Sequence, residues 1–428
     1  MPIILPPEER DYILKLARRQ AEIAALPVMQ TRAKKWTDVN DCVPGARPPV
    51  ALEAWTFERD FFPQSLHQCK SDTGRWLEKH FLYNIRQHEI FNDDHVCPGT
   101  FDIGWQVWCE EFGLKIKTDH AVDAEGHVLG YHWDPPIKDL KTDLAKIKPA
   151  SFGVNREKTL EFKKDLEEFL GDIMPVRIRG DAFGNGSLTQ RAVWLMSQET
   201  FFLAMYDAPD ELHQLMAMLR DNAKRIALWA EAEGLLTINN QNQCTCGTCF
   251  NFTTKLPRRP VENGKVRLSD MWLREDSQET VGVSPELFHE FCHPYYADLA
   301  SLYGFVYWGC CEPADTIWEK SLSKLPNLRA VSISRWANEE RMAEAFAGRD
   351  IVFSRKPDPN LFSLHYDLDE SAWRAHIRAT LEACTKHSVP CEFVVRDVYS
   401  MKGNLMKTRR AVELANEEID RFYGPEKQ

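Results

Sequence analysis

Two adjacent cysteines, Cys310 and Cys311, follow a short apolar run and stand just before a Glu-Pro turn. Thiols in such a place can be buried fillers, a redox pair or ligands for a soft metal ion. An earlier apolar run ends in the acidic residues Glu275, Asp276 and Glu279. A catalytic zinc ion typically has three protein ligands and one open position. A thiolate with nearby carboxylates is therefore a candidate zinc site, and the alternatives are solvated loop charges and packed thiols.

Three further cysteines, Cys244, Cys246 and Cys249, form a C-x-C-x-x-C pattern. This spacing can bind zinc or iron, but a four-ligand structural site usually needs a second pair of cysteines, and none follows at a suitable distance. The surrounding polar and proline-containing residues indicate a loop of about 240–266 inserted between elements of the main fold. A metal site, a loop of reduced thiols and a lid over an active site all stay open.

The segment between the acidic residues and the paired cysteines predicts a helix. Ser284 can cap its start, and Pro285 suits its first turn. Pro294 should interrupt it, because proline removes a backbone hydrogen-bond donor. Glu290 lies about six residues into this helix, roughly 9 Å along its axis. The helix must therefore tilt toward the strand ends if Glu290 is to reach a metal ion there.

Beyond about residue 155, short β-rich runs alternate with amphipathic helical stretches, which is typical of a parallel sheet covered by helices. With the runs VALEAW, PVRIR and LLTINN the number of strands comes to about eight, which favours an α/β fold of the TIM (β/α)8 barrel type. Active-site residues of such barrels lie at the C-terminal ends of the strands. The paired cysteines, Arg355, Lys356 and Asp397 should then face one mouth. No GxGxxG stretch indicates a dinucleotide site.

The first third of the chain is organised differently. Residues 1–45 predict a helical extension with an amphipathic helix over 7–25, and residues 46–428 would form the barrel. An irregular, aromatic-rich part over about 90–150 is expected to elaborate the barrel. Within it, the sequence indicates a hairpin that turns at 125–126.

Composition narrows the possible functions. The chain has 428 residues, 43% of them hydrophobic and 27% charged, which suits a large folded core. The formal net charge of −11 argues against broad binding to nucleic acid. We find no signal-peptide pattern at the N-terminus and no apolar run of transmembrane length. A cytoplasmic location with mostly free thiols is therefore expected.

The stretch from LSDMWLREDSQE to GFVYWGCCEP resembles the central part of the uroporphyrinogen decarboxylase-like superfamily, and IVFSRKPDPNLF and EFVVRDVYSMKGNL resemble its later strands. The resemblance covers roughly residues 155–428. The superfamily includes porphyrinogen decarboxylases and methyltransferases that serve corrinoid proteins. The Arg-rich N-terminal motif of the decarboxylases has no counterpart here, which argues against a role in haem biosynthesis.

Among the methyltransferases, the sequence resembles the ether-cleaving enzymes of O-demethylase systems, with a zinc motif E-x14-E-x20-H. Glu275, Glu290 and Cys311 fall at this spacing, with cysteine in the place of histidine. The His-x-Cys pattern with a later Cys, used by coenzyme M methyltransferases, fits less well. Gly309 and Asp397 stand where its histidine and its later cysteine would be. Alternative zinc ligands are Cys310, Asp276 and Glu279.

The resemblance implies a methyltransferase that takes a methyl group from a methyl ether or methylamine-type donor. The acceptor would be a corrinoid on a separate protein, with zinc as Lewis acid. Arg355 or Lys356 would bind a substrate carboxylate and Trp272 would stack on a ring, while Glu279 and Asp397 would be catalytic. A metal-free decarboxylase or lyase acting on a non-porphyrin substrate is the alternative, and a non-catalytic binding subunit is a third possibility. Both a monomer and a homodimer are open.

Overall fold

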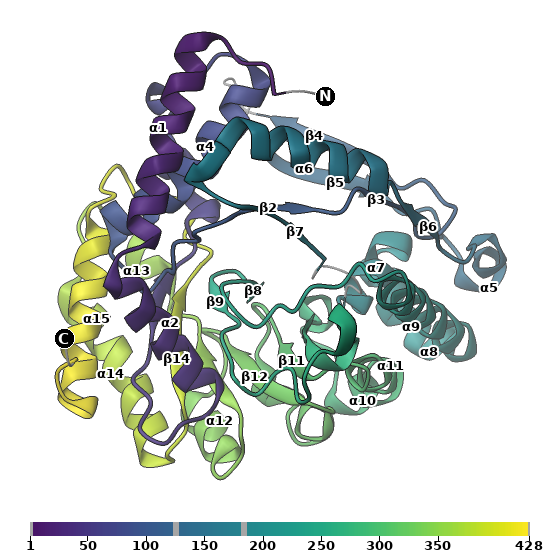
Figure 1. The fold of residues 1–428 in the computed structure, drawn as a ribbon. Coiled ribbons are helices and arrows are strands. Elements are labelled where there is room, and N and C mark those ends of the chain that lie inside the picture. The colour runs from purple at the N-terminus through teal and green to yellow at the C-terminus, as the bar shows by residue number, and fades with distance from the viewer. Residues whose placement is uncertain (1–2, 123–127, 181–185, 427–428) are drawn as a thin grey trace.

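The centre of the fold is a six-stranded parallel sheet with the strand order β1-β14-β13-β12-β11-β10 (Figure 1). The computed structural model describes residues 3–122, 128–180 and 186–426. The sheet confirms the predicted α/β class, and five of its strands come from the β-rich runs of the second half of the chain. The six strands of the sheet are β1 (Val50–Leu52), β10 (Trp272–Glu275), β11 (Phe305–Trp308), β12 (Leu328–Ile333), β13 (Val352–Arg355) and β14 (Cys391–Val395).

The rest of the predicted barrel is not joined to this sheet by a ladder of strands in the part of the chain that the structure describes. β2 (Phe101–Gly104) and β7 (Val176–Arg179) form a separate parallel pair. The run LLTINN forms no strand. Instead, Thr237 donates its N–H to the chain just after β7 (3.3 Å), and the side chain of Asn239 exchanges two hydrogen bonds with the backbone of Trp272 (2.8 and 3.0 Å). An amide side chain here replaces the backbone pairing expected of a strand.

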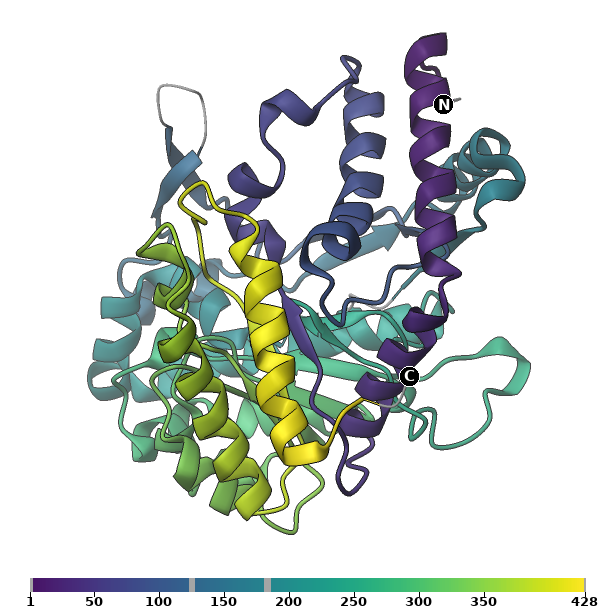
Figure 2. The same ribbon diagram turned by 90° about the vertical axis from the view of Figure 1, so that its left-hand side faces the viewer.

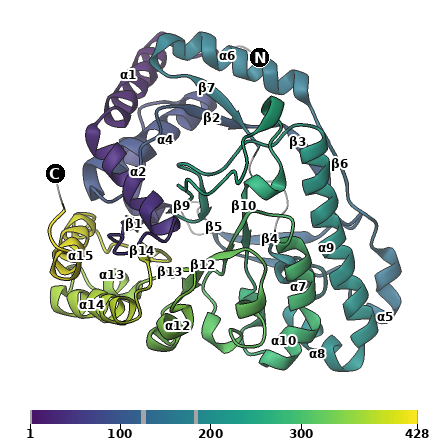
Figure 3. The same ribbon diagram turned by 60° about the horizontal axis from the view of Figure 1, so that its bottom comes forward.

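Helices cover the outside of the sheet (Figure 3). The predicted interruption at Pro294 is confirmed, because the helix stops at Phe291 and a new one starts at His293, with Pro294 in its first turn. The long helical stretch interrupted at Pro209 is confirmed as well. The covering helices are α7 (Leu188–Met196), α8 (Gln198–Asp207), α9 (Pro209–Ala232), α10 (Pro285–Phe291), α11 (His293–Ala300), α12 (Glu339–Phe346), α13 (Asn360–Ser363), α14 (Glu370–Lys386) and α15 (Lys407–Tyr423).

The elements of the N-terminal third pack against one another and against the sheet. The helix expected over 7–25 is confirmed as α1 (Pro7–Ala24), which packs on α4 (Asp72–Arg86). β4 (Lys117–Val122) and β5 (Val128–Asp134) pair as the expected antiparallel hairpin, whose turn at 125–126 lies outside the described residues. The other elements are α2 (Pro27–Asn40), α3 (Glu58–Phe61), α5 (Leu140–Asp143), α6 (Arg156–Leu170), and strands β3 (Val107–Glu110), β6 (Ser151–Val154), β8 (Cys244–Cys246) and β9 (Cys249–Phe250).

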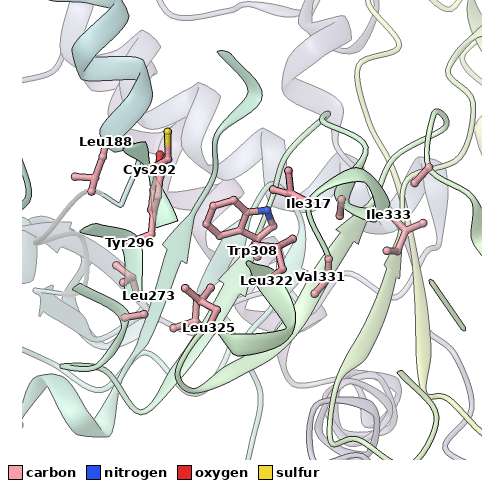
Figure 4. Packing of buried hydrophobic residues seen from close by; sticks show 14 of the residues in the cluster. Leu188, Leu273, Cys292, Tyr296, Trp308, Ile317, Leu322, Leu325, Val331 and Ile333 are labelled. Atoms are coloured by element: carbon pink, nitrogen blue, oxygen red, sulfur yellow. The ribbon is translucent and has the colours of Figure 1, made fainter. Parts of the chain in front are cut away.

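Successive side chains of each strand point to opposite faces of the sheet, so the sheet has an outer face under the helices and an inner face. Trp308, Leu273 and Val331 pack on the outer face with Tyr296 of α11 (Figure 4). The inner face carries a different cluster, which includes Trp272, Tyr307, Ala330, Val352 and Val394. In the described part of the chain, no helix is long and apolar enough to cross a membrane.

Candidate functional site

A cavity of about 520 Å³ opens at the C-terminal ends of strands β11 to β14. Its wall contains both adjacent thiols, Cys310 and Cys311, with Lys356, Arg396 and Asp397. A parallel sheet brings the C-terminal ends of its strands to one edge, which is where sequence analysis places the chemistry. The remaining lining residues are Ser334, Arg335, Trp336, Pro357, Pro359, Asn360, Ser363, Val398, Tyr399, Ser400 and Lys402.

A tight turn after β11 presents the two thiols. Gly309 has a positive φ of 100°, a backbone conformation that residues other than glycine rarely adopt. The carboxylate of Glu312 then accepts the N–H of Cys310 at 2.9 Å, and Ser332 donates its hydroxyl to the carbonyl of Cys310 at 2.7 Å. These contacts fix the backbone that carries both sulfurs. The turn is therefore rigid on both sides of the thiol pair.

The thiol pair and Asp397 form one hydrogen-bonded group. The sulfurs of Cys310 and Cys311 are 3.5 Å apart, and Cys311 donates to Oδ2 of Asp397 at 3.2 Å. The pKa of Cys310 is lowered by the hydrogen bond from Cys311 and by the charges of Arg396 and Arg274, against the effect of burial. The pKa of Cys311 is raised by the same pairing and by burial. Cys310 is thus the more acidic thiol, and Cys311 keeps its proton.

Two buried cations stand beside the thiols. Lys356 donates from Nζ to the hydroxyl of Ser354 at 2.6 Å and to the sulfur of Cys249 at 3.1 Å. Arg396 lies between two carboxylates, with Nε 3.4 Å from Glu53 and 3.3 Å from Asp397. Both cations are buried, so their charges act in a region of low dielectric constant. An anionic group that enters the cavity would meet the ammonium group of Lys356, whereas the charge of Arg396 is shared between two carboxylates.

The outer rim of the cavity is partly aromatic. The guanidinium of Arg335 lies over the ring of Trp336, 4.3 Å from its centre, and forms an ion pair with Asp358 at 2.6 Å. Trp336 is 67% exposed, and Tyr399 is 70% exposed. Both rings line the cavity, so the rim can contact an apolar part of a ligand or of a partner protein.

The predicted zinc ligands do not come together. Glu275 points to the outer face of the sheet, where Gly186 approaches it closely enough to leave no room for a Cβ atom. Its side chain is fully buried, neither carboxyl oxygen has a hydrogen-bond partner among the described residues, and burial raises its pKa well above the ordinary value. A protonated carboxyl group is a poor metal ligand. Glu290 is exposed on α10, away from the inner face that carries Lys356.

Within residues 3–122, 128–180 and 186–426, we find no group of three or more His, Cys, Asp or Glu side chains arranged to hold a metal ion. The donor set expected from the sequence therefore does not fit a zinc site, and we assign no step of the chemistry to zinc. Of the predicted ligands, only Cys310 and Cys311 lie at the cavity.

The predicted substrate-binding and catalytic residues divide in the same way. Lys356 and Asp397 line the cavity. Arg355, one residue earlier, points to the outer face, where it pairs with Glu339 of α12 at 2.5 Å. Trp272 is the first residue of β10 and packs against Phe305. It lies at the opposite end of the strand from the cavity and does not line it. Glu279 is outside the cavity and accepts a hydrogen bond from Thr189 at 3.0 Å.

Four residues of the site were not predicted from the sequence. Arg396 lies on the same inner face as Val394, two residues earlier in β14. The alternation of side chains along a strand could have predicted this position. Glu53 follows β1 in the same manner. Cys249 comes from the inserted loop and reaches the inner face only in three dimensions, so no local pattern indicates it. Trp336, one residue after Arg335, belongs to the loop that follows β12.

Comparisons with known proteins show similarity to solved structures. No family model matches the chain, and no curated protein sequence matches it. The chain is similar in structure to a methyltransferase from Methanosarcina mazei, with a TM-score of 0.48 and 12% sequence identity. The superposition covers 92% of this chain and 99% of the other.

Proposed function

We propose that this protein is a methyltransferase that takes a methyl group from a small anionic donor and passes it to a corrinoid protein. The observation that carries the proposal is the cavity at the C-terminal ends of β11 to β14, which combines the thiol pair, Asp397 and two buried cations. The sequence resemblance to corrinoid-dependent methyltransferases supports the same activity. When bound to its own protein, a reduced corrinoid supplies a strong cobalt nucleophile for the methyl group.

The residues of the cavity would bind and orient the donor. Lys356, held by Ser354 and Cys249, offers a fixed positive charge to a carboxylate or similar anion. Trp336 at the rim offers a flat apolar surface to the rest of the molecule. A donor bound in this way would hold its methyl group toward the open side of the cavity, where a partner can reach it.

The thiol pair would stabilise the atom that the methyl group leaves. The raised pKa of Cys311 keeps its proton on sulfur, and this S–H, which points to Asp397 in the structure, would turn to the leaving atom when the donor binds. A departing oxygen or nitrogen gains negative charge or a lone pair in the transition state, and a placed donor stabilises it.

The rim supports docking of a second protein over the cavity. Exposed apolar side chains on the loops after α13 and β14, Leu364, Tyr366 and Met406, join those of Trp336 and Tyr399. The loop between β14 and α15, coloured yellow, projects beyond the sheet in Figure 2. Exposed aromatic and methionine side chains are enriched at protein interfaces.

The proposal is tested with the reduced protein under anaerobic conditions, with free cob(I)alamin as methyl acceptor. Methoxylated benzoates, quaternary ammonium carboxylates and methylamines are offered as donors, and methylcobalamin is followed by its absorbance. At least one donor should react, and Cys311→Ala and Lys356→Met should slow the reaction at least tenfold. Cys109→Ala, a change of an exposed thiol on β3 outside this cavity, is the control. Methylamines lack an anionic group and serve as the comparison, so no reaction with either carboxylated donor class overturns the proposal.

A decarboxylase or lyase is the second candidate, and one observation favours it. Lys356 and Arg396 face the same cavity as Asp397, so a carboxylated substrate could be anchored by cations beside a group that exchanges a proton. Release of carbon dioxide from the same carboxylated compounds, in the absence of cobalamin, would favour this reaction over methyl transfer.

A further inference from the structure

A buried cysteine and a buried lysine from distant parts of the chain meet behind the cavity. Cys249 belongs to β9 in the inserted loop, and Lys356 follows β13. The Nζ atom of Lys356 lies 3.1 Å from the sulfur of Cys249, and the two residues are 3% and 4% exposed. Only a small movement separates this contact from bonding distance.

Polar side chains that can move protons surround the pair. The hydroxyl of Ser354 lies 2.6 Å from Nζ of Lys356 and 3.5 Å from the sulfur of Cys249, and it donates to the carboxylate of Glu392. The hydroxyl of Tyr307 lies 2.9 Å from that of Ser354. Ser354 thus links the lysine to a buried carboxylate that can accept a proton from it.

We propose that Cys249 and Lys356 form a reversible covalent S–N bond when a peroxide oxidises the cysteine. In the first step the thiol reacts with hydrogen peroxide to give a sulfenic acid and water, so that the sulfur loses two electrons and the peroxide gains them. In the second step the neutral amine of Lys356 attacks the sulfur. The S–N bond forms, the S–O bond breaks, and the hydroxide leaves as water with a proton from nitrogen. The ammonium form first passes its extra proton through Ser354 to Glu392.

The structure favours this bond over other fates of the sulfenic acid. A sulfenic acid condenses with a nearby nitrogen when one is held in reach, and the amine of Lys356 is held beside the sulfur before a second peroxide arrives. Lys356 lines the cavity while Cys249 lies behind it, so the cavity is the route by which a peroxide arrives. A thiol reductant would attack the S–N bond and restore both side chains.

The bond would regulate the cavity by removing the positive charge of Lys356. This consequence rests on the proposed function, in which Lys356 binds the anionic donor, whereas the bond itself does not. Oxidation would then abolish donor binding until a reductant reopens the link. The C-x-C-x-x-C loop thereby gains a role that needs no metal ion.

The experiment treats the full-length reduced protein with hydrogen peroxide, blocks remaining thiols, digests the protein and analyses the peptides by mass spectrometry. We expect the Cys249 peptide joined to the Lys356 peptide, with the summed mass less two hydrogens, and separation of the two by dithiothreitol. Cys249→Ser should abolish the link. Cys292→Ser, which changes a fully buried thiol of the outer face, should leave it intact.

Several results would overturn the proposal. These are Cys249 recovered as sulfinic acid without a link, Cys249 in a disulfide with Cys244 or Cys246, and Cys249 unmodified after Cys310 and Cys311 have reacted. A linked pair heavier by one oxygen would show an N–O–S bridge and would also overturn the S–N assignment. Because peptide masses do not depend on catalysis, failure of the link and failure of the methyl-transfer assay are distinguishable.

Discussion

The carboxylate of Asp397 lies 3.2 Å from the sulfur of Cys311, although the two residues are 86 positions apart. Cys311 follows β11 and Asp397 follows β14, which are three steps apart in the strand order. In a flat sheet, three steps of about 4.8 Å would separate these strand ends by roughly 14 Å. The loops after β11 and β14 must therefore reach across the strand ends that lie between them, and the cavity lies where they meet.

Asp397→Asn should make Cys311 more reactive. The negative charge of Asp397 contributes to the raised pKa of Cys311, so its removal favours the thiolate. We expect alkylation of Cys311 by iodoacetamide at neutral pH to be roughly threefold faster or more. Peptide mass spectrometry over time measures the rate at each cysteine. Asp358→Asn, which changes the partner of Arg335 at the rim, is the control, and an equal acceleration in both variants would contradict the role of Asp397.

The strand ends were predictable from the sequence, but the face to which each side chain points was predicted less well. The apolar runs located β11 to β14 and thereby placed Cys310 and Lys356 at the right edge. Arg355 and Lys356 are neighbours, so a strand sends them to opposite faces, and only one of them lines the cavity. The position at a strand end and the motif spacing assigned Glu275 to the metal site, although it shares the outer face with Leu273.

Contacts that join distant segments could not be predicted. The position of Cys249 depends on how the inserted loop folds back onto the inner face, and no periodicity describes that path. The run LLTINN reads as a strand because of its leucine and isoleucine residues. Its asparagine side chains instead take the hydrogen bonds of the neighbouring backbone, which local propensity does not reveal.

Glu275→Gln should flatten the dependence of stability on pH. Burial raises the pKa of Glu275 above its ordinary value of 4.5, so the folded state holds a proton that the unfolded state releases. Its contribution to stability is complete below the unfolded pKa and is lost as pH rises toward the folded one. The free energy of unfolding should fall by up to about 1.4 kcal/mol per pH unit in that range.

Urea unfolding between about pH 5 and about pH 8 measures this slope. The slope should be smaller in Glu275→Gln than in the wild type, but not zero, because burial also raises the pKa of Glu312 and Glu279. Glu290→Gln, a change of an exposed carboxylate on α10, should leave it unchanged. Equal slopes in the wild type and Glu275→Gln would show that Glu275 is ionised in the folded protein.

Glu418→Gln should destabilise the packing of α14 against α15. The side chain of Glu418 is fully buried, and it pairs with Arg374 at 2.9 Å and Arg378 at 3.0 Å on α14. Removal of its charge leaves two guanidinium groups without their shared partner, at a loss of about 2 kcal/mol or more. Thermal unfolding should show a lower midpoint than in Glu413→Gln, which changes an exposed carboxylate of the same helix. Similar midpoints would show that solvent satisfies the arginines.

Lys356→Met and Arg355→Met should separate substrate binding from stability. Lys356 lines the cavity, so its replacement should lower kcat/KM for an anionic donor at least tenfold, about 1.4 kcal/mol, chiefly through KM. Arg355 pairs with Glu339 on the outer face and donates to the carbonyl of Ser334 at 2.7 Å. Its replacement should instead lower the free energy of unfolding, since the half-buried carboxylate of Glu339 loses its partner.

The two variants are compared in the cob(I)alamin assay and in urea unfolding. A donor that lacks the anionic group provides the internal control, because Lys356→Met should affect its turnover little. If Arg355→Met raised KM selectively for the anionic donor while Lys356→Met did not, the assignment of the two faces at the end of β13 would be reversed. The alternation of side chains along one strand therefore decides which of two adjacent cations recognises the substrate.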